Sequence, residues 1–240
     1  MTALRDWTTA RVGLGLAGHA CPTREMLDLR LAQARARDAV HAPLDVVSLT
    51  ANLAQNGRPS QRLHSQARDR AEYLRRPDLG RILSEPSRET VATYAGSRLA
   101  ALAQPVFIVV DGLSALAVER HAPALLKAVF GEEQRPPDES RPLWIVEQGR
   151  VAIGDAIGES LGAAMTVVLI GERPGLSSPD SLGLYLTWAP RSGRTDAERN
   201  CISNIHEQGL SYYSAAHKLL FLMREAQRRE LSGGSSAAFS

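Results

Sequence analysis

The sequence predicts an α/β protein with a Rossmann-like, mainly parallel sheet that is flanked by helices and preceded by a helical N-terminal region. From residue 105 onward, short apolar runs alternate with longer helical patterns, as expected of strands that are buried on both faces. Residues 1–104 are instead rich in Arg, Ala and Leu and poor in β-branched runs. We therefore divide the chain into a helical region at 1–104 and an α/β domain at 105–240.

The N-terminal region is expected to consist of helices. Thr23 is placed to cap a helix that runs to about His41, and Leu27 and Leu31 recur in it at helical spacing. Residues 44–104 are expected to form further helices, because their composition stays the same and prolines interrupt them. These prolines are Pro59, Pro77 and Pro86.

Four strands are expected after residue 104. Three of them are continuous apolar runs and the fourth alternates between apolar and polar residues. Helical patterns at 114–130 and 151–162 separate the apolar runs, which favours parallel pairing. The expected strands are 105–110, 143–146, 166–170 and 184–188.

A final helix is predicted from an N-cap residue, a stripe of apolar residues and two glycines that follow it. Ser211 is a suitable N-cap residue, and apolar residues then recur at helical spacing from Tyr212 to Met223. Gly233 and Gly234 are expected to end the helix, and the tail at 235–240 is expected to be disordered.

Composition excludes several classes of protein. The 28 basic and 26 acidic residues give a net charge of +2, without the excess of basic residues expected of a nucleic-acid-binding protein. No window approaches the roughly 18 apolar residues of a membrane span, and the N-terminus lacks the apolar core of a secretory signal. Cys21 and Cys201 show neither metal-ligand spacing nor a disulfide framework. We therefore expect a cytoplasmic protein.

The carboxyl ends of the predicted strands are the expected place for a ligand. Each apolar run gives way there to small and polar residues, and a long loop follows the third run up to residue 183. Ordinary βα turns are the alternative interpretation. Asp111 and Glu147 lie on the same edge, although an acid that caps a helix would look the same. The segments concerned are 111–112, 147–149 and 171–175.

A glycine pattern at 13–18 raises the possibility of dinucleotide binding. It fits the G-x-G-x-x-G fingerprint of dinucleotide binding, which requires a strand before it and a helix directly after it. The preceding residues make a poor strand, and Pro22 intervenes before the helix. A stand-alone Rossmann-type dinucleotide-dependent enzyme remains the alternative, because the strand pattern allows it. A scaffold protein without a ligand is a third possibility.

Ungapped blocks along nearly the whole chain resemble the family of ethanolamine ammonia-lyase small subunits. Blocks of this length are far more specific than a short motif. They are ARVGLG at 10–15, PTRE at 22–25, ARARDAVH at 34–41, LRRPDLG at 74–80, DGLSA at 111–115, LIGERPGLSSPDSLG at 169–183 and RNCISNI at 199–205.

The resemblance implies a hetero-oligomer with a large subunit, with adenosylcobalamin held at the interface. It implies that the substrate binds in the large subunit, so that this chain has no catalytic residue of its own. The complex then converts ethanolamine to acetaldehyde and ammonia by radical chemistry, and residues 1–104 contact the large subunit. Some members carry an N-terminal extension that we do not expect here. The resemblance leaves open whether the enzyme is packed into a bacterial microcompartment.

The family's cobalamin-contacting positions correspond to Val151, Glu172 and Cys201. A glutamate accepts hydrogen bonds from the amide or ribose groups of the cofactor, and Arg173 suits its phosphate or a carboxylate of the partner. We expect the corrinoid to rest where 149–151 and 171–173 emerge from adjacent strands. Without the resemblance, Val151 is equally a packing residue, Glu172 a solvated acid or a partner of Arg173, and Cys201 a small buried hydrophobe.

His206 lies in a pattern that approaches the Asp-x-His-x-x-Gly motif of some cobalamin enzymes. In that motif the histidine binds cobalt and the aspartate orients its ring. Asn204 replaces the aspartate here. We therefore do not expect His206 to be a cobalt ligand.

Overall fold

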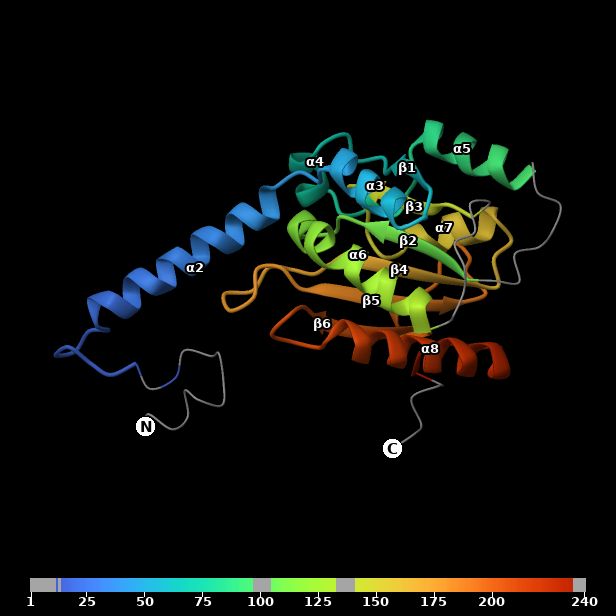
Figure 1. Ribbon diagram of the computed structural model, residues 1–240. Helices are drawn as coiled ribbons and strands as arrows, with labels where there is room; N and C mark the ends of the chain where they lie inside the picture. Colours follow the sequence, from blue (N-terminus) through green and yellow to red (C-terminus); the bar gives the residue numbers. More distant parts are fainter. Residues whose placement is uncertain (1–11, 13, 97–104, 133–140, 235–240) are drawn as a thin grey trace.

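The computed structural model describes residues 12, 14–96, 105–132 and 141–234. A six-stranded sheet in the order β1-β3-β2-β4-β5-β6 forms its centre (Figure 1). The first four strands in this order pair in parallel, whereas β5 and β6 are antiparallel to their neighbours. The predicted class, a mainly parallel sheet flanked by helices, is confirmed. The strands are β1 Ser60–His64, β2 Val106–Val110, β3 Leu143–Glu147, β4 Met165–Gly171, β5 Leu182–Trp188 and β6 Arg199–Ile205.

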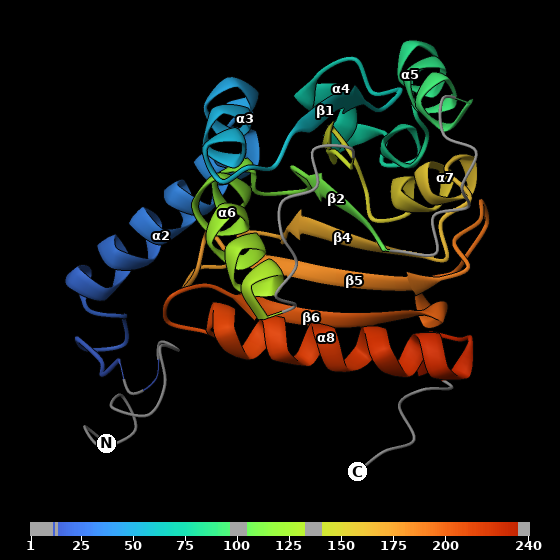
Figure 2. The same cartoon turned by 45° about the vertical axis from the view of Figure 1, so that its right-hand side comes forward.

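Two apolar layers hold the sheet between its helices. On one face, α3 (Val46–Gln55), α6 (Ala115–Glu132) and α8 (Tyr212–Arg229) pack against it, and α6 and α8 also pack against each other (Figure 2). On the other face lie α5 (Glu85–Gly96) and α7 (Ile153–Ser160). Each fully buried Leu, Ile, Val or Phe in these layers stabilises the fold by about 1.5–3 kcal/mol.

The apolar runs predicted as strands are confirmed as β2, β3, β4 and β5, and the intervening helical patterns are α6 and α7. Two strands were not predicted. β1 lies within 44–104, where only helices were expected, and it pairs with β3 at the edge of the sheet. β6 forms the opposite edge. The predicted domain boundary adjoins 97–104, outside the described residues, and stays a prediction.

The first described helix, α2 (Thr23–His41), extends away from the sheet (Figure 1). The expectation that Thr23 caps it is wrong, because Pro22 is the N-cap residue and Thr23 is already helical. Within α2 only Ala39 is buried, whereas Leu27 is 58% and Leu31 is 49% exposed. The apolar spacing of α2 therefore does not serve the core of this chain.

Two short elements lie between β1 and α5 in the chain. They are α4 (Arg70–Arg75) and the 3-10 helix η1 (Leu79–Arg81). Arg70 donates from Nε to the carbonyl of Val40 at 2.7 Å, which fixes the last turn of α2 to this region. A second 3-10 helix, η2 (Asp196–Glu198), precedes β6.

The cap of the last helix is confirmed, since Ser211 Oγ accepts a hydrogen bond from Ser214 N at 3.2 Å. The predicted stop is wrong. α8 ends at Arg229, where Glu230 takes a left-handed conformation with φ of 55°, before either glycine is reached. The tail at 235–240 lies outside the described residues. No helix in the described ranges has the length and apolarity needed to cross a bilayer.

Candidate functional site

The carboxyl ends of β3, β2 and β4 meet at one edge of the sheet, because these strands are parallel. The expectation that 149–151 and 171–173 follow adjacent strands is wrong, since β2 lies between β3 and β4. The ends of β2 and β4 are tightly packed. Gly112 has φ of 57°, and a Cβ there would lie only 2.3 Å from the carbonyl oxygen of Gly171.

Asp111, at the end of β2, is occupied in holding this edge together. Its carboxylate accepts hydrogen bonds from Gln148 N at 2.9 Å and from Gly149 N at 3.1 Å, and Arg70 Nη1 lies 3.6 Å away. Burial raises the pKa of Asp111 to about 6, against the opposing effects of Arg70 and the two N–H groups. Asp111 therefore fixes the turn that leads to Val151. Glu147 is likewise engaged, in an ion pair with Arg62.

The second face of β5 and β6 carries the candidate site. Tyr185 of β5 lies directly opposite Cys201 of β6. Burial is the main cause that raises the pKa of Tyr185, and a side-chain hydrogen bond with Cys201 adds to it. Cys201 Sγ also lies 3.1 Å from Ser203 Oγ. Cys201 and Ser203 are both exposed, so this strand pair presents small polar groups to solvent.

Glu172 borders this face at the end of β4. Both of its carboxylate oxygens accept from Asn204 N, at 3.2 and 3.4 Å, and its own backbone N donates to Ser181 O. Gly183, which is buried, lets Glu172 pack closely against β5. A Cβ at Gly183 would lie 3.0 Å from Glu172 Oε1 and 3.4 Å from Tyr185 Cε2.

Val151, which follows β3, lies near Tyr185 as well. Val151 and Tyr185 both line a cavity of about 920 Å³ that runs over the outer surface of α7. Ala152 and Ala156 contribute to its lining, so α7 presents small side chains there. The remaining lining residues are Pro77, Arg81, Ile82, Leu83, Arg88, Arg150, Asp155, Glu159, Ser160, Ser192, Gly193, Arg194, Thr195 and Asp196.

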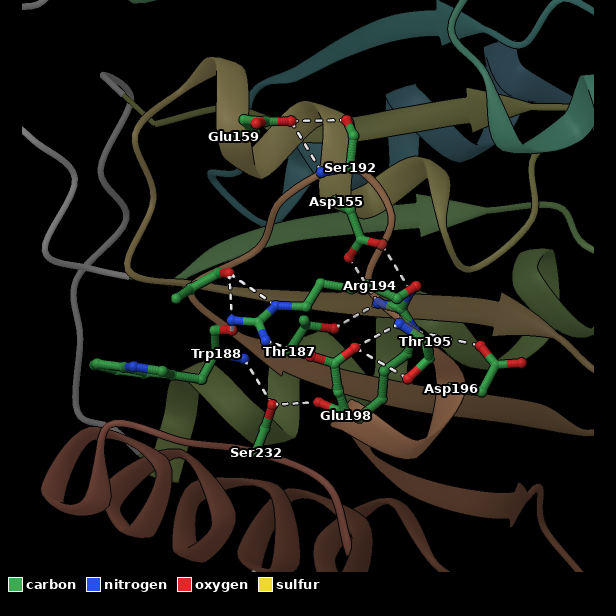
Figure 3. A network of polar contacts seen from close by, with 12 residues as sticks. Asp155, Glu159, Thr187, Trp188, Ser192, Arg194, Thr195, Asp196, Glu198 and Ser232 are labelled. Carbon is green, nitrogen blue, oxygen red and sulfur yellow. Dashed lines mark hydrogen bonds and ion pairs between the residues drawn. The ribbon is translucent and has the colours of Figure 1, made fainter. Parts of the chain in front are cut away.

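A polar network fixes the far end of this cavity (Figure 3). Arg199 bonds to both carboxylate oxygens of Asp155 and to Thr187 Oγ1, which joins β6 to α7 and β5. Arg194 pairs with Glu198 and donates to the carbonyl of Ala189 (Figure 3). The segment between β5 and β6 is therefore held in place against α7.

Val151, Glu172 and Cys201 are thus brought together around Tyr185. Arg173 is exposed and forms no ion pair within the described residues. His206 is engaged locally, since its Nε2 lies 2.9 Å from Asn204 Oδ1 in the turn that follows β6. No three His, Cys, Asp or Glu side chains of the described residues are grouped so that they would hold a metal ion.

Tyr185 is the site residue that the sequence interpretation missed. Its signal was the alternation in LGLYLTW at 182–188, where the leucines face one side of a strand and Gly183, Tyr185 and Thr187 face the other. The leucines are buried in the core, so the other three positions belong to the opposite face of the sheet. Alternation of this kind separates a core face from a candidate binding face.

The chemistry of this surface suits a large, flat, amide-rich ligand. Glu172 offers a carboxylate acceptor, and Tyr185, Cys201 and Ser203 offer groups that both donate and accept. Gly183 lets Glu172 and Tyr185 pack closely against the backbone of β5, because a Cβ there would crowd both. Val151 adds apolar contact. These residues fit the edge of a corrinoid with its neutral amide arms.

Comparison with known proteins agrees with this chemistry. The sequence profile of the family described as "Ethanolamine ammonia-lyase light chain (EutC)" matches residues 1–235. The chain is 57% identical over 232 residues to the ethanolamine ammonia-lyase small subunit of Pseudomonas fluorescens (strain Pf0-1), covering 96% of this chain and 84% of that protein. It is 54% identical over 231 residues to the small subunit of Ralstonia nicotianae, covering 96% and 85% respectively.

Proposed function

Because the chain belongs to the ethanolamine ammonia-lyase light-chain family, we propose that the open face around Tyr185 holds adenosylcobalamin against the large subunit. The chain is the small subunit of ethanolamine ammonia-lyase and works together with a large subunit. The enzyme depends on adenosylcobalamin, which supplies the radical chemistry by which ethanolamine is converted to acetaldehyde and ammonia. The single observation that supports the site is the convergence of Val151, Glu172 and Cys201 around Tyr185.

Glu172 is the proposed acceptor for the amide N–H groups of the corrinoid. Each carboxylate oxygen has two lone pairs, and the described residues supply only the N–H of Asn204 to the pair of oxygens. Acceptor capacity therefore remains for a ligand. The same contact with Asn204 holds the side chain in one orientation, so little conformational entropy is lost on binding.

Val151 and Tyr185 are proposed to supply apolar contact, and Cys201 and Ser203 to supply weaker polar contacts at the margin. Tyr185 is held by its neighbour Cys201, which keeps the ring of Tyr185 along the face. The roles of this chain are therefore to bind and orient the cofactor and to shield it from water. The residues that bind the substrate are proposed to lie on the large subunit.

The N-terminal region is proposed to contact the large subunit through α2. Leu27 and Leu31 on α2 are 58% and 49% exposed, and Leu16, which precedes the helix, is 77% exposed. Exposed apolar side chains grouped in this way are typical of a surface that is covered by a partner. The helix extends away from the sheet (Figure 1), so it can reach a neighbouring subunit without covering the open face.

Replacing Glu172 with Ala tests the proposed cofactor site. In the assembled complex, E172A should weaken retention of adenosylcobalamin, measured by corrinoid absorbance after gel filtration, while the melting temperature of the apo complex stays close to that of the wild type. E132A, at an exposed acid at the end of α6 on the opposite face of the sheet, is the matched control. Unchanged cofactor affinity in E172A would remove Glu172 from the site.

A further inference from the structure

Arg150 lies directly before Val151 and lines the cavity over α7. Its backbone N donates to Gly80 O at 2.7 Å, and its guanidinium lies 4.4 Å from the centre of the Tyr73 ring. Nε of Arg150 is buried and has no hydrogen-bond partner among the described residues. A buried, unsatisfied donor of this kind is costly unless a ligand or water satisfies it.

The acids that line the cavity are already engaged. Asp155 and Asp196 both contact Arg199, and Glu159 accepts two hydrogen bonds from Ser192. None of these acids forms an ion pair with Arg150 within the described residues.

Two of the arginines in the lining are also paired, Arg88 with Glu85 and Arg194 with Glu198. Arg81 and Arg150 form no ion pair within the described ranges. These two guanidinium groups are therefore available to an anion.

A second guanidinium lies close to that of Arg150. Arg70 lies 4.9 Å from the centre of the same Tyr73 ring, and its charge is balanced by the buried carboxylate of Asp111 at 3.6 Å. Asp111 is therefore committed to Arg70 and does not pair with Arg150.

We propose that Arg150, with Arg81 beside it in the cavity, forms an anion subsite that binds the phosphodiester of the cobalamin nucleotide loop. This inference rests on the proposed function and adds to it the part of the cofactor that the cavity holds. Among the groups of cobalamin that this surface can meet, the amide arms and the ribose are neutral and the phosphodiester is anionic. A guanidinium is suited to a phosphate because its N–H groups form charge-assisted, bidentate hydrogen bonds.

Arg173, which the sequence interpretation assigned to the phosphate, is the competing candidate. It is exposed, follows Glu172 in the chain and is not among the residues that line the cavity. An exposed arginine is screened by water, whereas the buried Nε of Arg150 has no competing partner. The two positions therefore make opposite predictions for the same measurement.

The experiment uses the complex of small and large subunits without cofactor. The dissociation constants of three corrinoids are measured by absorbance titration: adenosylcobalamin, adenosylcobinamide phosphate, which keeps the phosphate but lacks the nucleoside, and adenosylcobinamide, which lacks both. R150Q should weaken binding of the first two by about 10- to 100-fold and leave the third unchanged. R150K keeps the charge but loses the bidentate N–H donors of the guanidinium. It should therefore weaken binding of the same two corrinoids by a smaller factor than R150Q does.

The control variants are R224Q, at an exposed arginine on α8, and R173Q. An equal loss for all three corrinoids in R150Q, no loss in any, or the selective loss in R173Q instead, would each overturn the phosphate assignment. E172A, measured in parallel, should weaken all three. If E172A weakens none of them, the proposed function fails, and that outcome is separate from the result for Arg150.

Discussion

Arg199 and Asp155 form a bidentate ion pair in which both hydrogen bonds measure 2.6 Å, and their side chains are only 1% and 2% exposed. Arg199 belongs to the edge strand β6 and Asp155 to α7, so the pair joins two elements that are distant in the sequence. The pair also lies at the end of the cavity that contains Val151. Removing one partner would leave the other charged and buried.

R199M should therefore destabilise the small subunit by about 3–5 kcal/mol, because an unpaired charge would remain in the interior. The free energy of unfolding from urea titration measures the effect. R228M, which breaks an exposed pair with Glu225, should cost no more than about 1 kcal/mol. In the double variant R199M/D155L most of the loss should be recovered, and equal losses in R199M and R228M would contradict the account.

Asp111 should make the stability of the subunit fall as pH rises. Its pKa is raised from 3.8 to about 6 by burial, so the folded state holds a proton that the unfolded state has released between these values. The stabilisation is complete below about pH 4 and is lost as pH rises through about 6, by about 3 kcal/mol in total. Urea unfolding of wild type and D111N between pH 4 and 7.5 tests this. The advantage of wild type over D111N should shrink with rising pH, and parallel curves would refute the assignment.

Gly183 should be required for cofactor binding, because it sets the positions of Glu172 and Tyr185. G183V would displace both side chains, since a Cβ there already lies 3.0 Å from Glu172 Oε1 and 3.4 Å from Tyr185 Cε2, while valine itself suits a strand. Overpacking of this size predicts a loss of adenosylcobalamin affinity of at least about tenfold, measured by titration of the complex. G131A is the control, since a Cβ at Gly131 meets nothing within 4 Å. Normal affinity in G183V would show that no ligand approaches this strand closely.

The double variant L27S/L31S should weaken assembly with the large subunit. Both leucines are exposed on α2, so the melting temperature of the isolated small subunit should not change. If a partner buries both, loss of their burial predicts a rise of about 100-fold or more in the dissociation constant of the two subunits. Analytical ultracentrifugation measures it, with V47S on α3 as the exposed-residue control. Unaltered assembly would assign α2 another role.

The sequence predicted the central strands because their burial on both faces makes them continuously apolar, as in β2, where every residue is buried. The edge strands lack such a continuous apolar run. In β1 only Leu63 is buried, and in β6 only Arg199, Ile202 and Ile205 are buried, with Asn and Ser between them. Their pairing partners are set by tertiary structure, which local patterns do not record.

The candidate site was predicted in part for the same reason. Glu172 follows an apolar strand, so its place at the edge of the sheet was visible in the sequence. Cys201 lies on a strand without an apolar run, and only the family resemblance drew attention to it. The position of Arg150 over Tyr73 depends on a contact across 77 residues of chain, and no spacing in the sequence indicates it.

The antiparallel arrangement of β5 and β6 has a consequence for how a binding surface arises in this fold. Adding a parallel strand requires a crossover, which in α/β proteins brings a helix across the sheet. β5 and β6 instead run antiparallel to the preceding strand and need no crossover, so the sheet gains two strands without gaining a helix over Tyr185 and Cys201. The order in which the strands are connected therefore keeps this part of β5 and β6 accessible, and its side chains can change without affecting the connections of the fold.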